Sequence, residues 1–190
     1  MSCDEMNYGH GCYRYGTFAF LGRGKKKQKI KHNIFFVLVF LSGMEKDIPV
    51  STKYFDRACQ LNFAKGCHNA AIAYMQGDGC EKDVKRGLDY YKKACSGSIA
   101  ESCLNLWSAY FKGQNGDVVK DGPAALEYAS KACDLDLFQG CVNAAIMCRR
   151  GDGVPKDAER EKEFLEKANN LKKRINEPGV QFGETHKNLD

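Results

Sequence analysis

The chain has 190 residues, enough for one domain or one repeat array with its own hydrophobic core. Its formal net charge is +5, but five lysines lie in residues 25–31, and the remaining chain holds 24 basic and 24 acidic residues. The excess charge is therefore local and does not predict a nucleic-acid partner. The apolar run at residues 34–41 is far shorter than the ~20 residues of a spanning helix, so we expect no membrane span.

The start of the chain, MSCDEMNYGHGCYRYG, is polar and contains acidic residues. A secretory signal needs an apolar core, and a transit peptide is poor in acidic residues. The first sixteen residues therefore match neither kind of targeting segment.

Four segments resemble one another and begin at Gly11, Gly66, Ser102 and Gly140. The last three lead into the amphipathic stretches LDYYKKAC, LEYASKAC and FLEKANNL, and their starts are offset by 36 and 38 residues. A period of this size, with a small-residue-rich helix, a glycine-containing turn and a second helix, is typical of helix–turn–helix solenoids. We therefore predict an all-α fold, a right-handed solenoid of helix pairs.

The first repeat is 19 residues too long, and the surplus is the segment KKKQKIKHNIFFVLVFLSG at 25–43. Its removal restores both the 36-residue spacing and the charge balance. We interpret it as a retained intron or a gene-model error, and the alternative is a genuine loop in the first turn. A membrane anchor is disfavoured, because eight apolar residues in a helix cover only ~12 Å. Sequencing transcripts across codons 24 to 44 distinguishes these readings.

These boundaries predict one repeat array over residues 1–175 and a flexible tail at 176–190. The repeats are expected at about 11–65 with the insert at 25–43, then 66–101, 102–139 and 140–175.

Eight of the ten cysteines form pairs that are eight or nine residues apart. The first cysteine of each pair ends a second helix and the other begins the next repeat, so the two face each other across a short turn. The Cα separation expected there falls in the 4.4–6.8 Å range of disulfides. The alternative is that they are buried thiols at helix contacts. The predicted disulfides are Cys3–Cys12, Cys59–Cys67, Cys95–Cys103 and Cys133–Cys141.

Four such bridges would require an oxidising compartment. Cys80, in a glycine-rich turn, is expected to be an exposed free thiol, and Cys148, in a first helix, a core residue. The sequence has no C-x-x-C, so it predicts neither a thioredoxin-type redox pair nor a paired-cysteine zinc site.

The sequence predicts no catalytic residues and no metal ligands. The S-x-x-K, S-D-N and K-T-G motifs of penicillin-recognising enzymes are absent. The G-x-G turns at 22, 77 and 151 lack the rest of a phosphate-binding loop, so we interpret them as helix–helix turns that need a positive φ. The four histidines are scattered along the chain and make no ligand set: His10, His32, His68 and His186.

The pattern A-C-x7-C-x-N, followed by a G-x-G turn and K-D, resembles the Sel-like repeat, a cysteine-bridged relative of the tetratricopeptide repeat. Two branches of that family share the bridges. One comprises bacterial cysteine-rich proteins linked to β-lactam binding, and the other is the cytochrome c oxidase assembly factor seven branch of the mitochondrial intermembrane space. The chain is more similar to the second, through CDEMNYGHGCYRYG, ACQLNFAKGCHNAA, GDGVPKD and the tail NNLKKRINEPGVQFGE.

Two features depart from the resemblance. The family has a further helical segment and cysteine pair upstream, so we expect that Met1 is not the true start. Trp107 also stands where the other repeats have the small residues Gly16, Ala71 and Ala145, which would allow close helix packing.

The resemblance implies a non-enzymatic scaffold that helps to assemble cytochrome c oxidase, respiratory complex IV, through protein partners and with haem as an implied cofactor. It also implies residence in the intermembrane space, import without a cleavable presequence, and folding by the oxidative folding machinery there. The alternative is a secreted or envelope cysteine-rich protein that binds cell-wall or host ligands, with weak β-lactam hydrolysis. A third reading is a cytosolic adaptor with reduced thiols.

The first helices of a stacked helical repeat line its concave face. In the tetratricopeptide register this would be an apolar groove suited to a hydrophobic peptide segment or a flat cofactor, although the same spacing also fits core residues. His68 and Met75 would project from one helix face, so they could not hold one iron from opposite sides, and His68 as sole haem ligand stays a hypothesis. The predicted groove consists of Tyr13, Phe20, His68, Ile72, Met75, Leu104, Phe111, Val142, Ile146 and Arg149.

Overall fold

The computed structural model describes residues 8–22, 46–113 and 117–176. The chain divides into two compact units, residues 1–99 and 100–190. The regular elements of the described residues are all α-helices, which confirms the predicted fold class. The predicted insert at 25–43 lies outside the described residues, as do Cys3 and residues 177–190 of the predicted tail.

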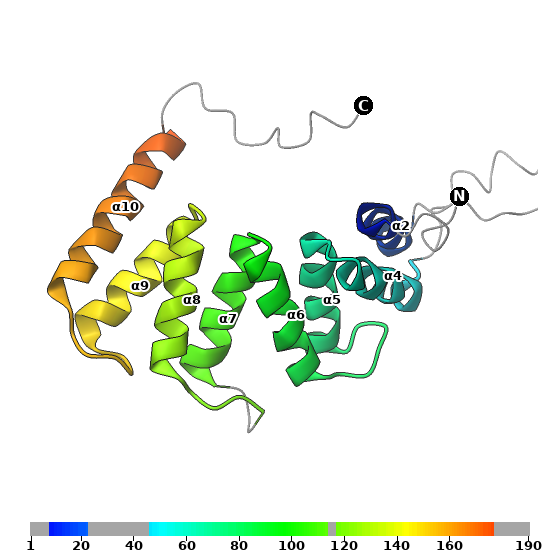
Figure 1. Cartoon of the computed structure of the whole chain (residues 1–190), viewed down its shortest axis with the longest axis horizontal. Coiled ribbons are helices and arrows are strands. Elements are labelled where there is room, and N and C mark those ends of the chain that lie inside the picture. Colours follow the sequence, from blue (N-terminus) through cyan, green and yellow to red (C-terminus); the bar gives the residue numbers. More distant parts are fainter. Residues whose placement is uncertain (1–7, 23–45, 114–116, 177–190) are drawn as a thin grey trace, which may run out of the picture. The chain divides into compact units, whose positions relative to one another are not determined.

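The first unit consists of two helix pairs. Helix α2 (Gly9–Leu21) packs along α4 (Ile48–Gln60), and α5 (Ala64–Gln76) packs along α6 (Val84–Ser96). Helix α4 also packs against α5, so the pairs stack on each other in chain order (Figure 1).

The second unit repeats this arrangement. Helix α7 (Ala100–Lys112) packs along α8 (Gly122–Asp134), and α9 (Phe138–Arg150) packs along α10 (Ala158–Asn176). Helices α8 and α9 join the two pairs (Figure 1). The longer α10 carries mostly charged residues on its exposed side.

The K-D of the repeat motif starts each second helix. The aspartate is the N-cap, and its carboxylate accepts a hydrogen bond from the backbone N–H three residues later, at 2.9 to 3.1 Å. This satisfies one of the orphan donors of the first helical turn. The four capping residues are Asp47, Asp83, Asp121 and Asp157.

The G-x-G turns end the first helices, as predicted. Gly22, Gly77 and Gly151 are the C-caps of α2, α5 and α9, with φ of 68°, 83° and 76°. A side chain is strained in this left-handed region, which is why glycine stands there.

Disulfides join consecutive repeats in the described residues. Cys59–Cys67 lies between α4 and α5, and Cys133–Cys141 lies between α8 and α9, each with a Cα separation of 4.4 Å. Three more cysteines, Cys12, Cys95 and Cys103, are also disulfide-bonded. Each described bridge therefore fixes the contact between one helix pair and the next, at the turn that the spacing predicted.

Cys80 and Cys148, which belong to none of the predicted pairs, are free thiols. Cys148 is 1% exposed and belongs to the core of the second unit, as expected. Cys80 is half-buried rather than exposed. Burial raises the pKa of both thiols above the ordinary value of a cysteine.

In each unit an aromatic side chain lies between the first two helices. It comes from the second helix of the pair in the first unit and from the first helix of the pair in the second unit. In the first unit Gly16 of α2 lies against the ring of Phe55 of α4. In the second unit the position of Gly16 is taken by Trp107, and the position of Phe55 by Ala129. Trp107 packs on the cluster that contains Ala129, and its Nε1–H points to the sulfur of Met147 at 3.3 Å. The large residue at Trp107 is therefore accommodated by a small residue on the partner helix.

Candidate functional site: an apolar pocket between three helices

A pocket of about 180 Å³ lies in the first unit, where α2, α4 and α5 meet. Its walls are mostly apolar. The apolar lining consists of Tyr13, Phe20 and Leu21 from α2, Ile48 and Phe55 from α4, and Ile72 and Ala73 from α5.

Aromatic contacts hold one side of this pocket in place. The ring of Tyr13 lies 5.8 Å from the ring of Phe55 and 5.2 Å from the ring of Phe63. Phe20, by contrast, is 46% exposed, with the ammonium group of Lys46 5.7 Å from its ring centroid. An aromatic ring this exposed at a pocket is available to a ligand.

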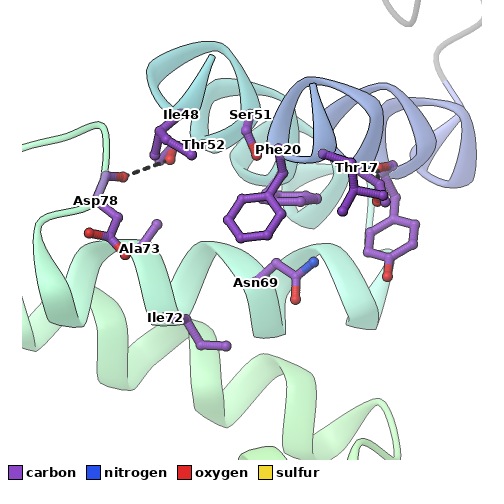
Figure 2. Close-up of a pocket in the computed structure, with 12 residues that line it drawn as sticks. Thr17, Phe20, Ile48, Ser51, Thr52, Asn69, Ile72, Ala73 and Asp78 are labelled. Carbon is purple, nitrogen blue, oxygen red and sulfur yellow. Dashed lines mark hydrogen bonds between the residues drawn. The ribbon is translucent and has the colours of Figure 1, made fainter. Parts of the chain in front are cut away.

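Five polar residues complete the lining: Thr17, Ser51, Thr52, Asn69 and Asp78. Two of the hydroxyl groups already donate hydrogen bonds within the protein. Thr17 Oγ1 donates to the backbone carbonyl of Tyr13 at 2.9 Å, and Thr52 Oγ1 donates to that of Asp78 at 2.8 Å. Figure 2 shows the second of these bonds at one end of the pocket, and Asn69 extending toward the same space as Phe20. The Asn69 amide can both donate and accept, so it is suited to a backbone or amide group of a ligand.

The size of the pocket limits what it can hold. Pockets for drug-sized ligands occupy ~300–1,000 Å³, so a cavity of about 180 Å³ suits one apolar side chain of a peptide. The pocket can provide apolar contacts and hydrogen bonds from the Asn69 amide, and these interactions serve to recognise a ligand.

The structure brings together three residues of the predicted groove in this pocket: Tyr13, Phe20 and Ile72. His68 and Met75, on the same helix as Ile72, are not among its lining residues. The His68 ring lies 5.9 Å from that of Tyr91. A Cβ added to Gly87 of α6 would lie 2.7 Å from the Met75 sulfur. Both side chains thus pack toward α6.

The other five predicted groove residues belong to the second unit. Phe111 stacks on Trp107 with ring centroids 5.3 Å apart, Val142 packs on the cluster around the Cys133–Cys141 bridge, and Arg149 pairs with Glu161 at 3.8 Å. Leu104 and Ile146 are half-buried. The placement of these residues on one concave face stays a prediction.

Sequence reasoning missed the walls that α4 supplies, because it considered only the first helix of each pair. Ile48, Ser51, Thr52 and Phe55 follow the spacing of one helical face, and that periodicity was the available signal. Asn69 was also missed, although an asparagine two residues after the cysteine that begins the first helix recurs in three repeats, as Asn69, Asn105 and Asn143.

His68, the haem-ligand candidate of the sequence, does not line this pocket. Among the described residues no three His, Cys, Asp or Glu side chains come together in a group that could hold a metal ion. His68 and Met75 pack toward α6, and the pocket is smaller than a drug-sized cavity. Haem binding, with His68 as its sole ligand, therefore stays a prediction.

Stacked pairs of helices, joined by glycine-capped turns and bridged by disulfides, define a helix–turn–helix repeat protein of the solenoid class. The Sel1 repeat model matches residues 40–63, 64–98, 100–137 and 139–172, which is more than half of the chain. The chain therefore belongs to the Sel1 repeat family, and it is a repeat scaffold.

Three known proteins are similar to parts of the chain or to its fold. A cytochrome c oxidase assembly factor 7 homolog from Drosophila melanogaster is 28% identical over 71 residues, which is 37% of this chain and 21% of that protein. The Sel1 repeat protein from Oxalobacter formigenes matches with a TM-score of 0.67 at 18% identity, over 90% of this chain and 59% of that one. The protective antigen c5321 from uropathogenic Escherichia coli matches with a TM-score of 0.58 at 17% identity, over 90% and 40%. The two solved structures support the fold alone.

No helix in the described part of the chain combines the length and the apolar character that crossing a membrane requires.

Proposed function

We propose that this chain is a non-enzymatic assembly factor for cytochrome c oxidase, respiratory complex IV, and that it binds a protein client. The observation that carries the proposal is the apolar pocket between α2, α4 and α5, with the exposed ring of Phe20 among its lining residues. A pocket that holds one apolar side chain beside an amide is the kind of site that recognises a peptide segment. The similarity to the assembly factor homolog from Drosophila supports the choice of pathway.

The proposed location is the mitochondrial intermembrane space, where the oxidative folding machinery would form the bridges during import. The seven disulfide-bonded cysteines of the described residues support an oxidising compartment. Fractionation of cells that express the full chain at its natural level tests the location. Recovery from the medium or the cell envelope would instead support the secreted alternative.

The test of function is rescue. Cells that lack the protein should lose assembled cytochrome c oxidase, and the wild-type chain should restore it. The variant Ile72→Lys places a charge in the pocket and should fail to rescue, although the protein still folds. Its matched control is Gln76→Lys, which adds the same residue to an exposed position of the same helix.

Two results would contradict the proposal in different ways. Normal oxidase levels in cells without the protein would rule out the role in complex IV. Full rescue by Ile72→Lys would show that the pocket is not the client site. If Ile72→Lys fails to rescue, a photo-crosslinking p-benzoylphenylalanine in place of Phe20 identifies the client by mass spectrometry, because this residue lines the pocket and is 46% exposed.

A further inference from the structure

Residues 56–95 and 130–169 repeat one another without gaps at an offset of 74. The local backbone of the two segments is the same. Three hydrogen bonds of the first segment recur in the second at this offset. In the first segment they are Gly77 N–H to Ala73 O (2.7 Å), Asp83 N–H to Tyr74 O (2.9 Å) and Arg86 N–H to Asp83 Oδ1 (3.0 Å). Their counterparts in the second segment are Gly151 N–H to Met147 O (2.9 Å), Asp157 N–H to Cys148 O (3.0 Å) and Arg160 N–H to Asp157 Oδ1 (3.0 Å). The side chains of one segment can therefore be compared with those of the other, position by position.

In the first unit Asp56, Tyr74, Arg86 and Tyr90 form a cluster of aromatic rings and an ion pair. The guanidinium of Arg86 lies 4.2 Å from the ring centroid of Tyr74 and 3.2 Å from Oδ1 of Asp56. The hydroxyl of Tyr90 accepts from Arg86 and donates to Asp56. Arg86 thus has a ring beneath it and a carboxylate at its edge.

In the second unit the arginine is retained but its partners are not. The counterparts of Tyr74, Asp56 and Tyr90 are Cys148, Ser130 and Phe164, and that of Arg86 is Arg160. Phe164 lies near Arg160, with the guanidinium 5.7 Å from its ring centroid. Among the described residues, no carboxylate forms an ion pair with Arg160.

A groove of about 660 Å³ occurs at this place, between α8 and the turn that leads into α10. Cys148, 1% exposed, lies at its base, and its walls include Leu126, Ser130 and Val154.

The charged side chains that line this groove carry a net positive charge. Lys131 is paired with Glu127 at 2.6 Å, and the carboxylate of Asp157 caps α10. Lys156 and Arg160, which also line the groove, have no ion-pair partner in the described part of the second unit. The groove therefore combines an apolar base with two available cations.

We propose that this groove binds an aromatic side chain of an acidic segment of a partner protein. The ring takes the place that Tyr74 occupies in the first unit, against the guanidinium of Arg160 and over Cys148. A neighbouring carboxylate of the partner takes the place of Asp56. The ligand chemistry is read from the filled copy of the same cluster, and it does not depend on the function proposed above.

The experiment uses the oxidised full chain labelled with ¹⁵N and the acetylated, amidated peptide Gly-Asp-Tyr-Asp-Gly. Saturable shifts are expected in the Arg160 side-chain N–H signal and in the backbone signals around Ser130 and Lys156. Replacing the peptide's tyrosine by alanine, or both aspartates by asparagine, should weaken binding at least about tenfold, since each removes a contact with the guanidinium.

Protein variants locate the site. Cys148→Tyr restores the ring that the first unit has and should abolish binding, and Arg160→Gln should weaken it at least about tenfold. Arg86→Gln is the matched control, because it makes the same change in the filled cluster, and it should bind as the wild type does. If Cys148→Tyr does not fold by circular dichroism, Ser130→Asp replaces it. That variant supplies the missing carboxylate and should remove the preference for aspartate in the peptide.

Wild-type affinity in both Arg160→Gln and the folded groove variant would overturn the proposal. So would equal weakening by Arg86→Gln and Arg160→Gln, or the absence of shifts at millimolar peptide.

Discussion

Gly16 of α2 lies against the ring of Phe55 of α4 so closely that a Cβ built on the glycine would be 2.8 Å from the ring carbon Cδ1. Real side-chain carbons do not approach so near, and the backbone carbonyl of Ser51 lies only 3.1 Å from the same point. Phe55 also lines the candidate pocket, so this contact determines where one wall of the pocket stands.

Gly16→Ala should therefore destabilise the protein by about 1–3 kcal/mol, the usual cost of overpacking a close contact. Urea unfolding followed by circular dichroism measures the change. The double variant Gly16→Ala with Phe55→Leu should recover part of the loss, because a smaller side chain leaves room for the new methyl group. A single variant as stable as the wild type would show that α2 and α4 can move apart at little cost.

Each described disulfide should contribute about 2–3 kcal/mol to the free energy of unfolding, from the entropy of a short closed loop. The paired substitutions Cys59→Ser with Cys67→Ser, and Cys133→Ser with Cys141→Ser, should lower stability by this amount in non-reducing urea titrations. Under reducing conditions the difference from the wild type should largely disappear. A persistent difference would mean that the serines disturb packing, rather than that a bridge is lost.

The number of free thiols should be two. Alkylation in denaturant without reductant should add two labels, at Cys80 and Cys148, and leave eight cysteines blocked until reduction. In the folded protein Cys80 should react first, because it is half-buried whereas Cys148 is 1% exposed. Peptide mapping by mass spectrometry separates the two. Ten labels without reductant would contradict the predicted bridges.

The cluster of Asp56, Arg86 and Tyr90 should make stability fall at high pH. Burial raises the pKa of Tyr90 to about 12, and its hydrogen bond to Asp56 adds to the rise. A raised pKa favours the neutral phenol in the folded state, so this contribution is complete below the unfolded pKa of about 10 and is lost as the pH rises to about 12.

Tyr90→Phe removes this titration and should cost about 1–2 kcal/mol at neutral pH, because a hydrogen bond to a carboxylate is lost. The gap in unfolding free energy between wild type and variant should narrow between pH 10 and pH 12. Tyr74→Phe keeps the ring beneath the Arg86 guanidinium and should cost less at neutral pH, although burial raises the pKa of Tyr74 as well, so a part of the pH dependence should also be lost in that variant. A gap that stays constant with pH would show that Tyr90 does not titrate in this range.

His68→Ala should leave haem affinity unchanged. The ring of His68 lies against Tyr91, and the Met75 sulfur packs on Gly87, so neither side chain is arranged to hold iron. Absorbance titration of both proteins with haem measures the affinity. Weaker binding by the variant would restore the hypothesis that His68 is a ligand.

Much of the fold followed from the sequence because its features act locally. Cysteines eight residues apart, one ending a helix and one beginning the next, can only meet across the turn between them, as Cys59 and Cys67 do. An aspartate after the G-x-G turn caps the next helix through a hydrogen bond to its own first turn, as Asp83 does. A glycine at the end of a helix can adopt a positive φ without strain, as Gly77 does.

The sites were decided by contacts between helices that are distant in the sequence. The repeat alone did not show that Trp107 is compensated by Ala129, or that Phe55 of a second helix forms a wall of the pocket. Nor did it show that a groove lies beside Arg160, where the smaller Cys148 stands at the position that Tyr74 has in the first unit. The spacing of residues along a chain determines which side chains share a helix face, whereas the volume left between two faces depends on both sets of side chains once they are packed. That volume, and therefore what each site can bind, is a property of the tertiary structure.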